Sequence, residues 1–373
     1  MTKSRFLNGA EASRQYGVLA GTYAASLMWD DPPADAAAEA LHAIPGNCWP
    51  MVLKVLDEGV DKVSGAPPEL AALIASLPPE PSADEWAAMD AGVAAIARTG
   101  DSAGLVLQCA SLMMDCWSPP AAKPLLLTNK MTPQPMHRFA QTAAWWIEVH
   151  RPGGMRRSAD GFKATLQARL IHAFVRRMAR GSGAWDRAAW GEPVNQGDLF
   201  FQVVGFTKVM IDGLARMGRG LSAAEKEGYY AFWRYTASVL GLRKTYLAMI
   251  NHEECSRFWH LWLLTNPPPD AETIALAKQT LDAFAGGGPL GFRHAFLRAT
   301  TYRLFGWEVG QGLKLRWSQL YHLLPVIYLL SRMWGGGDRS ANLQRAIASL
   351  SAGSAPERLE ALAKFAPAPS QAA

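Results

Sequence analysis

Cysteine is scarce in this sequence, and its spacing excludes several kinds of site. The 373 residues include four cysteines, which are Cys48, Cys109, Cys116 and Cys255. No two of them form a C-x-x-C pair, which excludes a zinc ribbon and a thioredoxin-type site. The absence of C-x-x-C-H excludes covalent c-type haem by its usual motif. Four cysteines without a pattern are typical of a reducing compartment.

An export signal and a long apolar run are also lacking. The first residues, MTKSRFLNGAEASRQYG, contain no apolar core and no paired arginines, so they do not resemble a secretory signal. We therefore expect a cytoplasmic protein, although a secreted chain that had lost its leader would look the same. The most apolar run, residues 320–334, is short for a bilayer span and contains Pro325. It predicts a buried helix and no stable membrane span.

Neither sign of charge dominates. The formal net charge is +5, the basic residues are scattered, and the sequence pI is about 9.0. This balance does not indicate a nucleic-acid partner. Because 49% of the residues are hydrophobic, the chain can bury a sizeable core and does not have the composition of a disordered protein.

Helical periodicity is what the sequence does contain. Apolar residues recur at three- and four-residue intervals, as on one face of an α-helix, and convincing alternating strands are absent. Ser222 and Glu225 have the spacing of a capping box at a helix start. The pattern predicts an all-α protein with helices over 33–44, 68–77, 84–99, 198–218 and 223–242.

Proline and glycine clusters mark breaks between helices without dividing the chain. None is long enough to tether two domains, so we expect a single helical domain over residues 1–353 and a flexible tail over 354–373. The breaks lie at 76–86, 116–124, 266–270, 285–291 and 334–338.

Several catalytic motifs are excluded by their spacing. A di-iron carboxylate bundle needs Glu-x-x-His twice, and only Glu39 with His42 supplies it. The zincin motif fails at His252, because no histidine follows four residues later. The chain also lacks a phosphate-binding loop, a dinucleotide-binding glycine motif and a nucleophile elbow.

The stretch ARLIHAFVRR, residues 168–177, combines a histidine with arginines in an apolar setting. Arg169 and Arg176 lie three residues before and four residues after His172, so all three project from nearly the same helical face. Buried guanidinium groups need acceptors. One solution is carboxylates from other helices with His172 as a core residue. The other is a haem b, whose iron would bind the imidazole and whose propionates would pair with the arginines.

A second polar strip lies upstream in MHRFAQTAAWWIEVH, residues 136–150. Arg138, Gln141 and Thr142 share one helical face, and Trp145 continues it. This strip is either a solvated helix face or part of a site. His137 lies off the strip and needs no special role.

Taken together, the two clusters resemble the latex clearing protein (rubber oxygenase) family, which includes the oxygenase of the mycophenolic acid pathway. The family pattern is a helix with Arg-x-x-Lys-Thr, then Arg-x-x-His-x-x-x-Arg, then a Trp-Gly-x-Pro-[Ile/Val]-Asn-Gln segment. The corresponding stretches here are RFAQT (138–142), RLIHAFVR (169–176) and WDRAAWGEPVNQGDL (185–199). Further similarity at WDDPPADAAAEAL (29–41) and GYYAFWRYTASVLGL (228–242) extends the resemblance over about 29–245.

The resemblance implies a globin-like helical core, with additional helices at both ends, that holds non-covalent haem b. It implies that His172 is the axial ligand of the haem iron, supported by Arg169 and Arg176. Arg138 and Thr142 match polar residues on the distal side. The family's distal lysine is replaced by Gln141, whose amide is a poor iron ligand but can donate a hydrogen bond to iron-bound dioxygen.

The function implied is a haem-dependent oxygenase, most simply a dioxygenase that cleaves a carbon–carbon double bond in an apolar isoprenoid-like or lipid substrate. Dioxygen would be the co-substrate, and an electron donor a possible partner. The alternatives are a monooxygenase or peroxygenase acting on a small hydrophobic substrate, a non-catalytic haem sensor or carrier, and a helical scaffold without a cofactor. The sequence names no general base.

The remaining aromatic and polar residues have simpler interpretations. Pro193, Asn195, Gln196 and Asp198 form a turn and an N-cap that lead into the 198–218 helix. Four aromatic residues either form a substrate channel or belong to the core, and they are Trp145, Trp146, Phe200 and Phe201. No role is assigned to His150, His252, His260, His294 and His322.

Overall fold

The predicted all-α fold is confirmed by a computed structural model. The backbone is described for residues 5–131, 135–157, 159–285 and 291–333, and the side chains for 5–127, 141–157, 159–285 and 291–330. No β-strand occurs in these residues. The α-helices, in chain order, are α1 (Gly9–Tyr16), α2 (Val18–Ser26), α3 (Pro32–His42), α4 (Trp49–Glu58), α5 (Pro68–Ala75), α6 (Ala83–Ala97), α7 (Asp101–Val106), α8 (Pro119–Met131), α9 (Pro135–His150), α10 (Asp160–Gly181), α11 (Arg187–Trp190), α12 (Gln196–Val204), α13 (Met210–Arg216), α14 (Ala223–Val239), α15 (Lys244–Leu247), α16 (His252–Thr265), α17 (Ala271–Phe284), α18 (Phe292–Phe305), α19 (Trp307–Gly312) and α20 (Leu320–Met333).

Local side-chain caps explain where several of these helices begin. The predicted capping box at the start of α14 is confirmed, because the Ser222 hydroxyl accepts from the Glu225 amide and Glu225 accepts in return from the Ser222 amide. Ser82 and Glu85 form a second box at α6. Each box satisfies amide groups that a helix start leaves without intrahelical partners.

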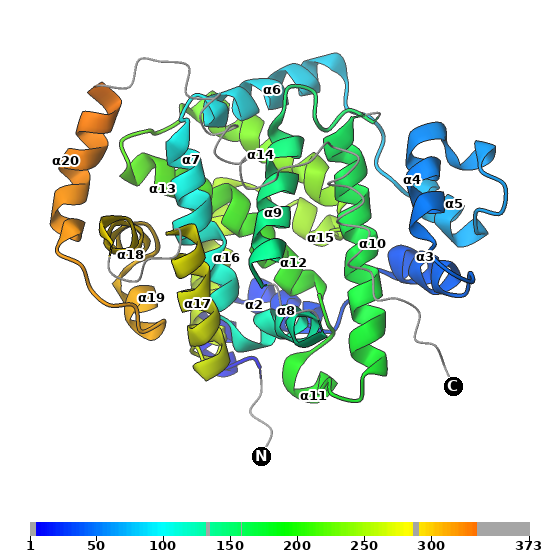
Figure 1. Ribbon diagram of the computed structural model, residues 1–373, viewed down its shortest axis with the longest axis horizontal. Helices are drawn as coiled ribbons and strands as arrows, with labels where there is room; N and C mark the ends of the chain where they lie inside the picture. Colours follow the sequence, from blue (N-terminus) through cyan, green and yellow to red (C-terminus); the bar gives the residue numbers. More distant parts are fainter. Residues whose placement is uncertain (1–4, 132–134, 158, 286–290, 334–373) are drawn as a thin grey trace.

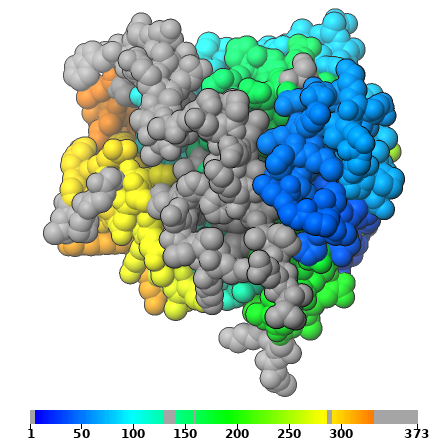
Figure 2. Space-filling view, turned by 45° about the vertical axis from the view of Figure 1, so that its right-hand side comes forward, coloured from blue at the N-terminus to red at the C-terminus, as the bar shows by residue number. Residues whose placement is uncertain are grey.

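Helix α10 stands between the centre of the molecule and a unit made of α3, α4 and α5. Figure 1 shows α9, α12 and α14 in the middle, α3 to α5 beyond α10 on one side, and α18 to α20 on the other. In the space-filling view the α3–α5 unit forms one block, coloured blue (Figure 2). Within the core, α6 packs along α14 and α9 packs against α10.

The predicted helix over 198–218 is present but not uniform. It begins at Gln196, contains a π-helical turn over Gly205–Val209, and ends at Arg216. A second π-helical turn, Leu107–Ser111, follows α7. The two turns face each other, since the Ser111 hydroxyl donates to the Gly205 carbonyl over 2.7 Å. A change of hydrogen-bond register of this kind often occurs near functional sites.

Two expectations from the sequence are wrong in detail. The break over 116–124 is shorter than expected, because α8 begins at Pro119 and carries Pro124 inside it. The run at 320–333 forms α20, but it is not a buried helix. Leu323, Val326 and Leu329 are 53%, 54% and 56% exposed, so composition identified the helix and not how it packs.

Two further expectations concern residues that the structure leaves out. The break at 334–338 and the tail over 354–373 lie outside the described residues. The limits of the single domain therefore stay a prediction. Among the described helices, none combines the length and the apolar character needed to cross a bilayer.

Candidate functional site

A cavity of about 260 Å³ lies where α8, α9, α10 and α12 meet. This volume is slightly below the range of about 300–1,000 Å³ that is typical of small-molecule sites. Its walls are mostly apolar, with a few polar side chains among them. The lining residues are Asp115, Ala121, Ala122, Pro124, Leu125, Gln141, Thr142, Trp145, Ala164, Ala168, Ile171, His172, Val175, Val194, Asp198, Leu199, Gln202, Phe206 and Leu240.

Helix α10 contributes one continuous face to this cavity. Ala164, Ala168, Ile171, His172 and Val175 line it, with spacings of four, three, one and three residues. Such spacings repeat one helical face, because successive residues rotate by about 100°. His172 is therefore the one imidazole on the cavity side of an otherwise apolar face among the described lining residues.

Helix α9 supplies the polar strip expected from the sequence. Gln141, Thr142 and Trp145 line the same cavity as His172. The Trp145 indole N–H donates to the Thr165 hydroxyl of α10 over 3.0 Å, which holds the two helices together at the cavity wall. Arg138 lies on α9, but its side chain is outside the described residues. The structure thus brings together three of the predicted residues, namely His172, Gln141 and Thr142.

Arg169 has a partner within the protein. Its Nε and Nη2 donate to the two carboxylate oxygens of Asp31 over 2.7 and 2.8 Å, and it does not line the cavity. Asp31 is thus a carboxylate of another helix segment, the acceptor that one of the two interpretations of the sequence expects for Arg169. A fork-shaped pair of this kind satisfies most of the donors of a buried guanidinium, and it fastens α10 to the start of α3.

Arg176 is only partly satisfied, although its side chain is 3% exposed. Its Nε donates to Asp35 over 2.6 Å and its Nη1 donates to the Val194 carbonyl over 3.2 Å. Its Nη2 is buried and has no hydrogen-bond acceptor among the described residues. An unused buried donor is costly, and a carboxylate of a bound group would satisfy it.

These features allow the fit of a haem b to be tested. The donor set is a single imidazole on an apolar wall, which suffices because a porphyrin supplies four iron ligands itself. The Arg176 Nη2 hydrogen has no acceptor one helical turn further on, and a propionate requires such a donor. The imidazole and its apolar wall therefore fit the group, whereas neither Arg169 nor Arg176 is among the lining residues. Among the described residues, no cluster of three or more His, Cys, Asp or Glu side chains could hold a metal ion by itself.

A polar cluster on the cavity wall was not foreseen from the sequence. Asp115 lies in the 3₁₀ turn Met113–Cys116 and accepts a hydrogen bond from the Gln202 amide of α12. Burial, with a smaller contribution from the charge of Asp198, raises the pKa of Asp115 to about 7. Asp198 itself is paired with Arg5 and accepts from Asn195 over 2.8 Å. One cavity carboxyl can therefore gain and lose a proton near neutral pH.

The aromatic candidates separate into wall and core. Trp145 lines the cavity, whereas Phe200 and Phe201 are not among its lining residues. Phe200 stacks on Tyr246 with ring centroids 4.4 Å apart, and Phe201 stacks on Trp262 at 3.9 Å. The two phenylalanines are thus core residues, and so is Trp146, which stacks on His150 at 3.9 Å.

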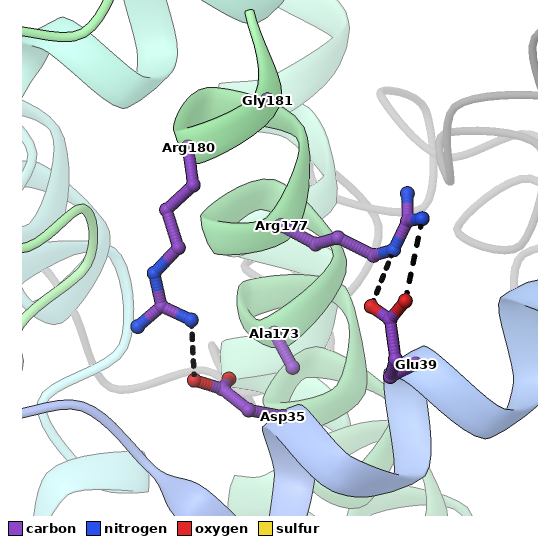
Figure 3. Close-up of a pocket in the computed structure, with 6 residues that line it drawn as sticks. All are labelled: Asp35, Glu39, Ala173, Arg177, Arg180 and Gly181. Carbon is purple, nitrogen blue, oxygen red and sulfur yellow. Dashed lines mark hydrogen bonds and ion pairs between the residues drawn. The ribbon is translucent and has the colours of Figure 1, made fainter.

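A second hollow lies on the surface between α3 and α10 (Figure 3). Its charged side chains pair with one another. Arg177 donates to Glu39 over 2.6 Å and Arg180 donates to Asp35 over 3.1 Å. Figure 3 shows both pairs bridging the two helices. We assign this hollow to the attachment of the α3–α5 unit and not to ligand binding.

Comparison with known proteins identifies the family of the chain. The sequence profile of the family described as "ER-bound oxygenase mpaB/B'/Rubber oxygenase, catalytic domain" matches residues 96–335. The match covers more than half of the chain, so the chain belongs to this family. The resemblance seen in the motifs is confirmed, and the match continues well beyond residue 245.

Individual relatives are distant. The chain is 21% identical to the rubber oxygenase of Streptomyces sp. (strain K30) over 244 residues, which cover 59% of this chain and 60% of that protein. The chain thus matches less than two thirds of that relative. The solved structure of a latex clearing protein in its closed state aligns with a TM-score of 0.59 at 18% identity, covering 91% of this chain and 90% of the other. That alignment shows a common fold.

Proposed function

We propose that this chain is a haem b-dependent oxygenase that cleaves a carbon–carbon double bond in an apolar, isoprenoid-like or lipid substrate. One observation carries the proposal. In a chain of this family, His172, Gln141 and Thr142 line one mostly apolar cavity although they lie on two helices. When bound, haem supplies the activation of dioxygen and the redox chemistry.

The residues of the chain would seat and orient the reactants. His172 would ligate the iron, and Arg176, which lies one helical turn along α10 and outside the cavity lining, would offer its unused Nη2 hydrogen to a carboxylate of the macrocycle. The Gln141 amide and the Thr142 hydroxyl are hydrogen-bond donors for dioxygen or for an ordered water. The apolar walls, including Ile171, Val175 and Leu199, would hold the substrate and exclude bulk water.

Asp115 is the candidate group for proton transfer in this cavity. Asp115 lines the cavity, and its carboxyl accepts a hydrogen bond from the Gln202 amide. Because its pKa is raised to about 7, it can be protonated or ionised under working conditions, as a general acid or base must be. It would hold or give up a proton at the carboxyl oxygen, beside the reacting atoms.

The first experiment measures haem. The purified protein should show the absorption band of a histidine-ligated haem, and His172→Ala should lose most of its haem content. His260→Ala is the matched control, because His260 is exposed on α16 and does not line the cavity. If H172A retains the haem content and ligand bands of the unmodified protein, the assignment of His172 is wrong.

The second experiment separates an enzyme from a haem carrier. Haem-loaded protein is incubated with an apolar alkene and a reductant, with and without dioxygen, and products are identified by mass spectrometry. Carbonyl products that require dioxygen support the proposed cleavage. Hydroxylated or epoxidised products indicate a monooxygenase or peroxygenase, and the absence of any product favours a sensor or carrier.

A further inference from the structure

One cavity residue has an unfavourable backbone conformation. Val194 has a φ of 47°, in the left-handed region, and it lies in the turn before α12. Only two other non-glycine residues of the described chain share a positive φ, and they are Asn8 and Lys314. A β-branched side chain is the least suited to this region, so residue 194 is strained where glycine would not be.

Hydrogen bonds on both sides of Val194 hold this conformation. Before it, the Glu192 amide donates to the Leu27 carbonyl over 2.8 Å. After it, Asn195 caps α12 by accepting from the Asp198 amide over 2.9 Å. The carbonyl of Val194 itself accepts from Arg176 over 3.2 Å. Strained conformations persist where the surroundings fix them from several sides, as they do here.

The side chain that causes the strain forms part of the cavity wall. Val194 lines the cavity together with Val175, Leu199 and Leu240. Glycine at position 194 would remove the strain but also the two methyl groups that stand in the cavity. The chain therefore has a valine at a position whose backbone conformation disfavours valine. Strained residues of this kind occur most often at active sites and ligand sites.

We propose that Val194 determines the size of the apolar ligand that the cavity admits, and that Arg176 and the capped start of α12 hold it in place for that purpose. This inference deepens the proposed function, because it concerns the substrate part of the same cavity. It assigns a specificity role to Val194, whose neighbours Pro193 and Asn195 the sequence presents as a turn and an N-cap.

The strain is tested by two substitutions at the same position. Val194→Ala keeps the strain and removes the methyl groups, whereas Val194→Gly removes both. At an ordinary position glycine is less stable than alanine. At position 194 we expect V194G to melt about 2–4 °C above V194A. Val63, with φ of −108° and outside the cavity, is the control site at which alanine should be the more stable.

The size role is tested with 4-alkylphenols, which combine an apolar chain with one polar group. Calorimetry compares the affinities for 4-ethylphenol and 4-hexylphenol in the purified proteins. Both V194A and V194G should raise the hexyl-to-ethyl affinity ratio by about 10-fold, because one methylene in an apolar pocket is worth at least that much. The same ratio should not change in V63A.

Two results would overturn the inference. They are an unchanged hexyl-to-ethyl ratio in both Val194 variants, and a V194A protein as stable as V194G. Haem content is measured in parallel. Normal haem content with an unchanged hexyl-to-ethyl affinity ratio counts against the role of Val194 alone. Absence of haem from the unmodified protein counts against the proposed function, and the tests of Val194 remain decisive.

Discussion

The side chain of Gly241 is a single hydrogen atom, and this leaves space for a buried ion pair. Gly241 has a φ of 92°, and a Cβ built there would lie 2.3 Å from the Asp31 Oδ2 and 2.5 Å from the Arg169 Nε. The ion pair between Arg169 and Asp31 ties α10 to the start of α3. The identity of residue 241 therefore affects how the helix that carries His172 is fixed.

Replacement of Gly241 by alanine should be strongly destabilising. The added methyl group would strain the backbone and push apart a buried pair, whose disruption alone typically costs about 3–5 kcal/mol. Urea unfolding should show a loss of at least about 3 kcal/mol. Gly218→Ala is the control, because Gly218 has a similar φ of 72° but open space around it, and about 1–2 kcal/mol of strain is expected there. Equal losses in the two variants would refute the role of the ion pair.

If the chain binds haem through His172, as proposed, Gln141 should decide whether the iron gains a second protein ligand. A glutamine amide is a poor iron ligand, whereas a neutral lysine amine can coordinate. In the haem-loaded protein, Gln141→Lys is expected to convert a ferric high-spin absorption and EPR spectrum into a low-spin one. Gln141→Leu, which offers no ligand, should stay high-spin. A low-spin spectrum already present in the unmodified protein would contradict this account of Gln141.

At the scale of the helices, glycine sets how closely α6 and α14 approach. A Cβ at Gly92 would lie 2.2 Å from the Tyr229 amide nitrogen, and one at Gly228 would lie 2.2 Å from the Ala88 carbonyl oxygen. Neither backbone can move without separating the two helices. The pair supports α9 as well, because His150 contacts Tyr229 through a 3.1 Å hydrogen bond.

Gly92→Ala should therefore reverse the usual effect of alanine in a helix. Alanine normally stabilises a helix interior by about 1 kcal/mol relative to glycine. Here overpacking should cost about 1–3 kcal/mol or more. Gly21→Ala, in α2 with nothing within 4 Å of its Cβ, should be stabilising and is the control. Thermal melts of the two variants that move in the same direction would argue against the close approach.

The elements also show what periodicity can and cannot predict. Helices α3, α5, α6 and α14 were predicted to within about three residues, because each has recurring apolar residues at helical spacing and α14 begins with a capping box that the sequence shows. The π-helical turns were not predicted, since their register depends on contacts such as Ser111 to Gly205. The exposure of α20 was missed for a similar reason, because apolar composition does not show which neighbours cover a helix.

The residues of the candidate site also differ in whether the sequence could predict them. Helical spacing marked His172, and the strip with Gln141 and Thr142, as two clusters, but it left open whether they were core, solvated face or site. The resemblance to the family assigned them to a site, and the structure places all three on one cavity. Asp115 could not be found, because it lies in a short 3₁₀ turn and meets Gln202 only through the tertiary fold. Whether an arginine pairs with Asp31 or with a ligand likewise depends on helices that are distant in the sequence.

At the scale of the whole molecule, the protonation of two buried groups should have opposite effects on stability at acidic pH. Burial lowers the pKa of His150 to about 3, so between about pH 3 and 6.5 the unfolded chain binds more protons and stability falls as the pH falls. Burial raises the pKa of Asp115 to about 7. Between about pH 3.8 and 7 the folded protein therefore binds the extra proton, and stability falls as the pH rises.

The two effects overlap and should largely cancel between about pH 4 and 6.5, where each contributes at most about 1.4 kcal/mol per pH unit. Asp115→Asn removes one of them and should make the protein lose stability steeply below pH 6.5. His150→Phe removes the other, keeps an aromatic ring against Trp146, and should make the protein more stable at pH 5 than at pH 7. Urea unfolding from pH 4.5 to 7.5 measures these slopes, and the comparison of the three proteins isolates the contributions of Asp115 and His150. Parallel pH profiles for D115N, H150F and the unmodified chain would show that neither group is buried in its unusual protonation state.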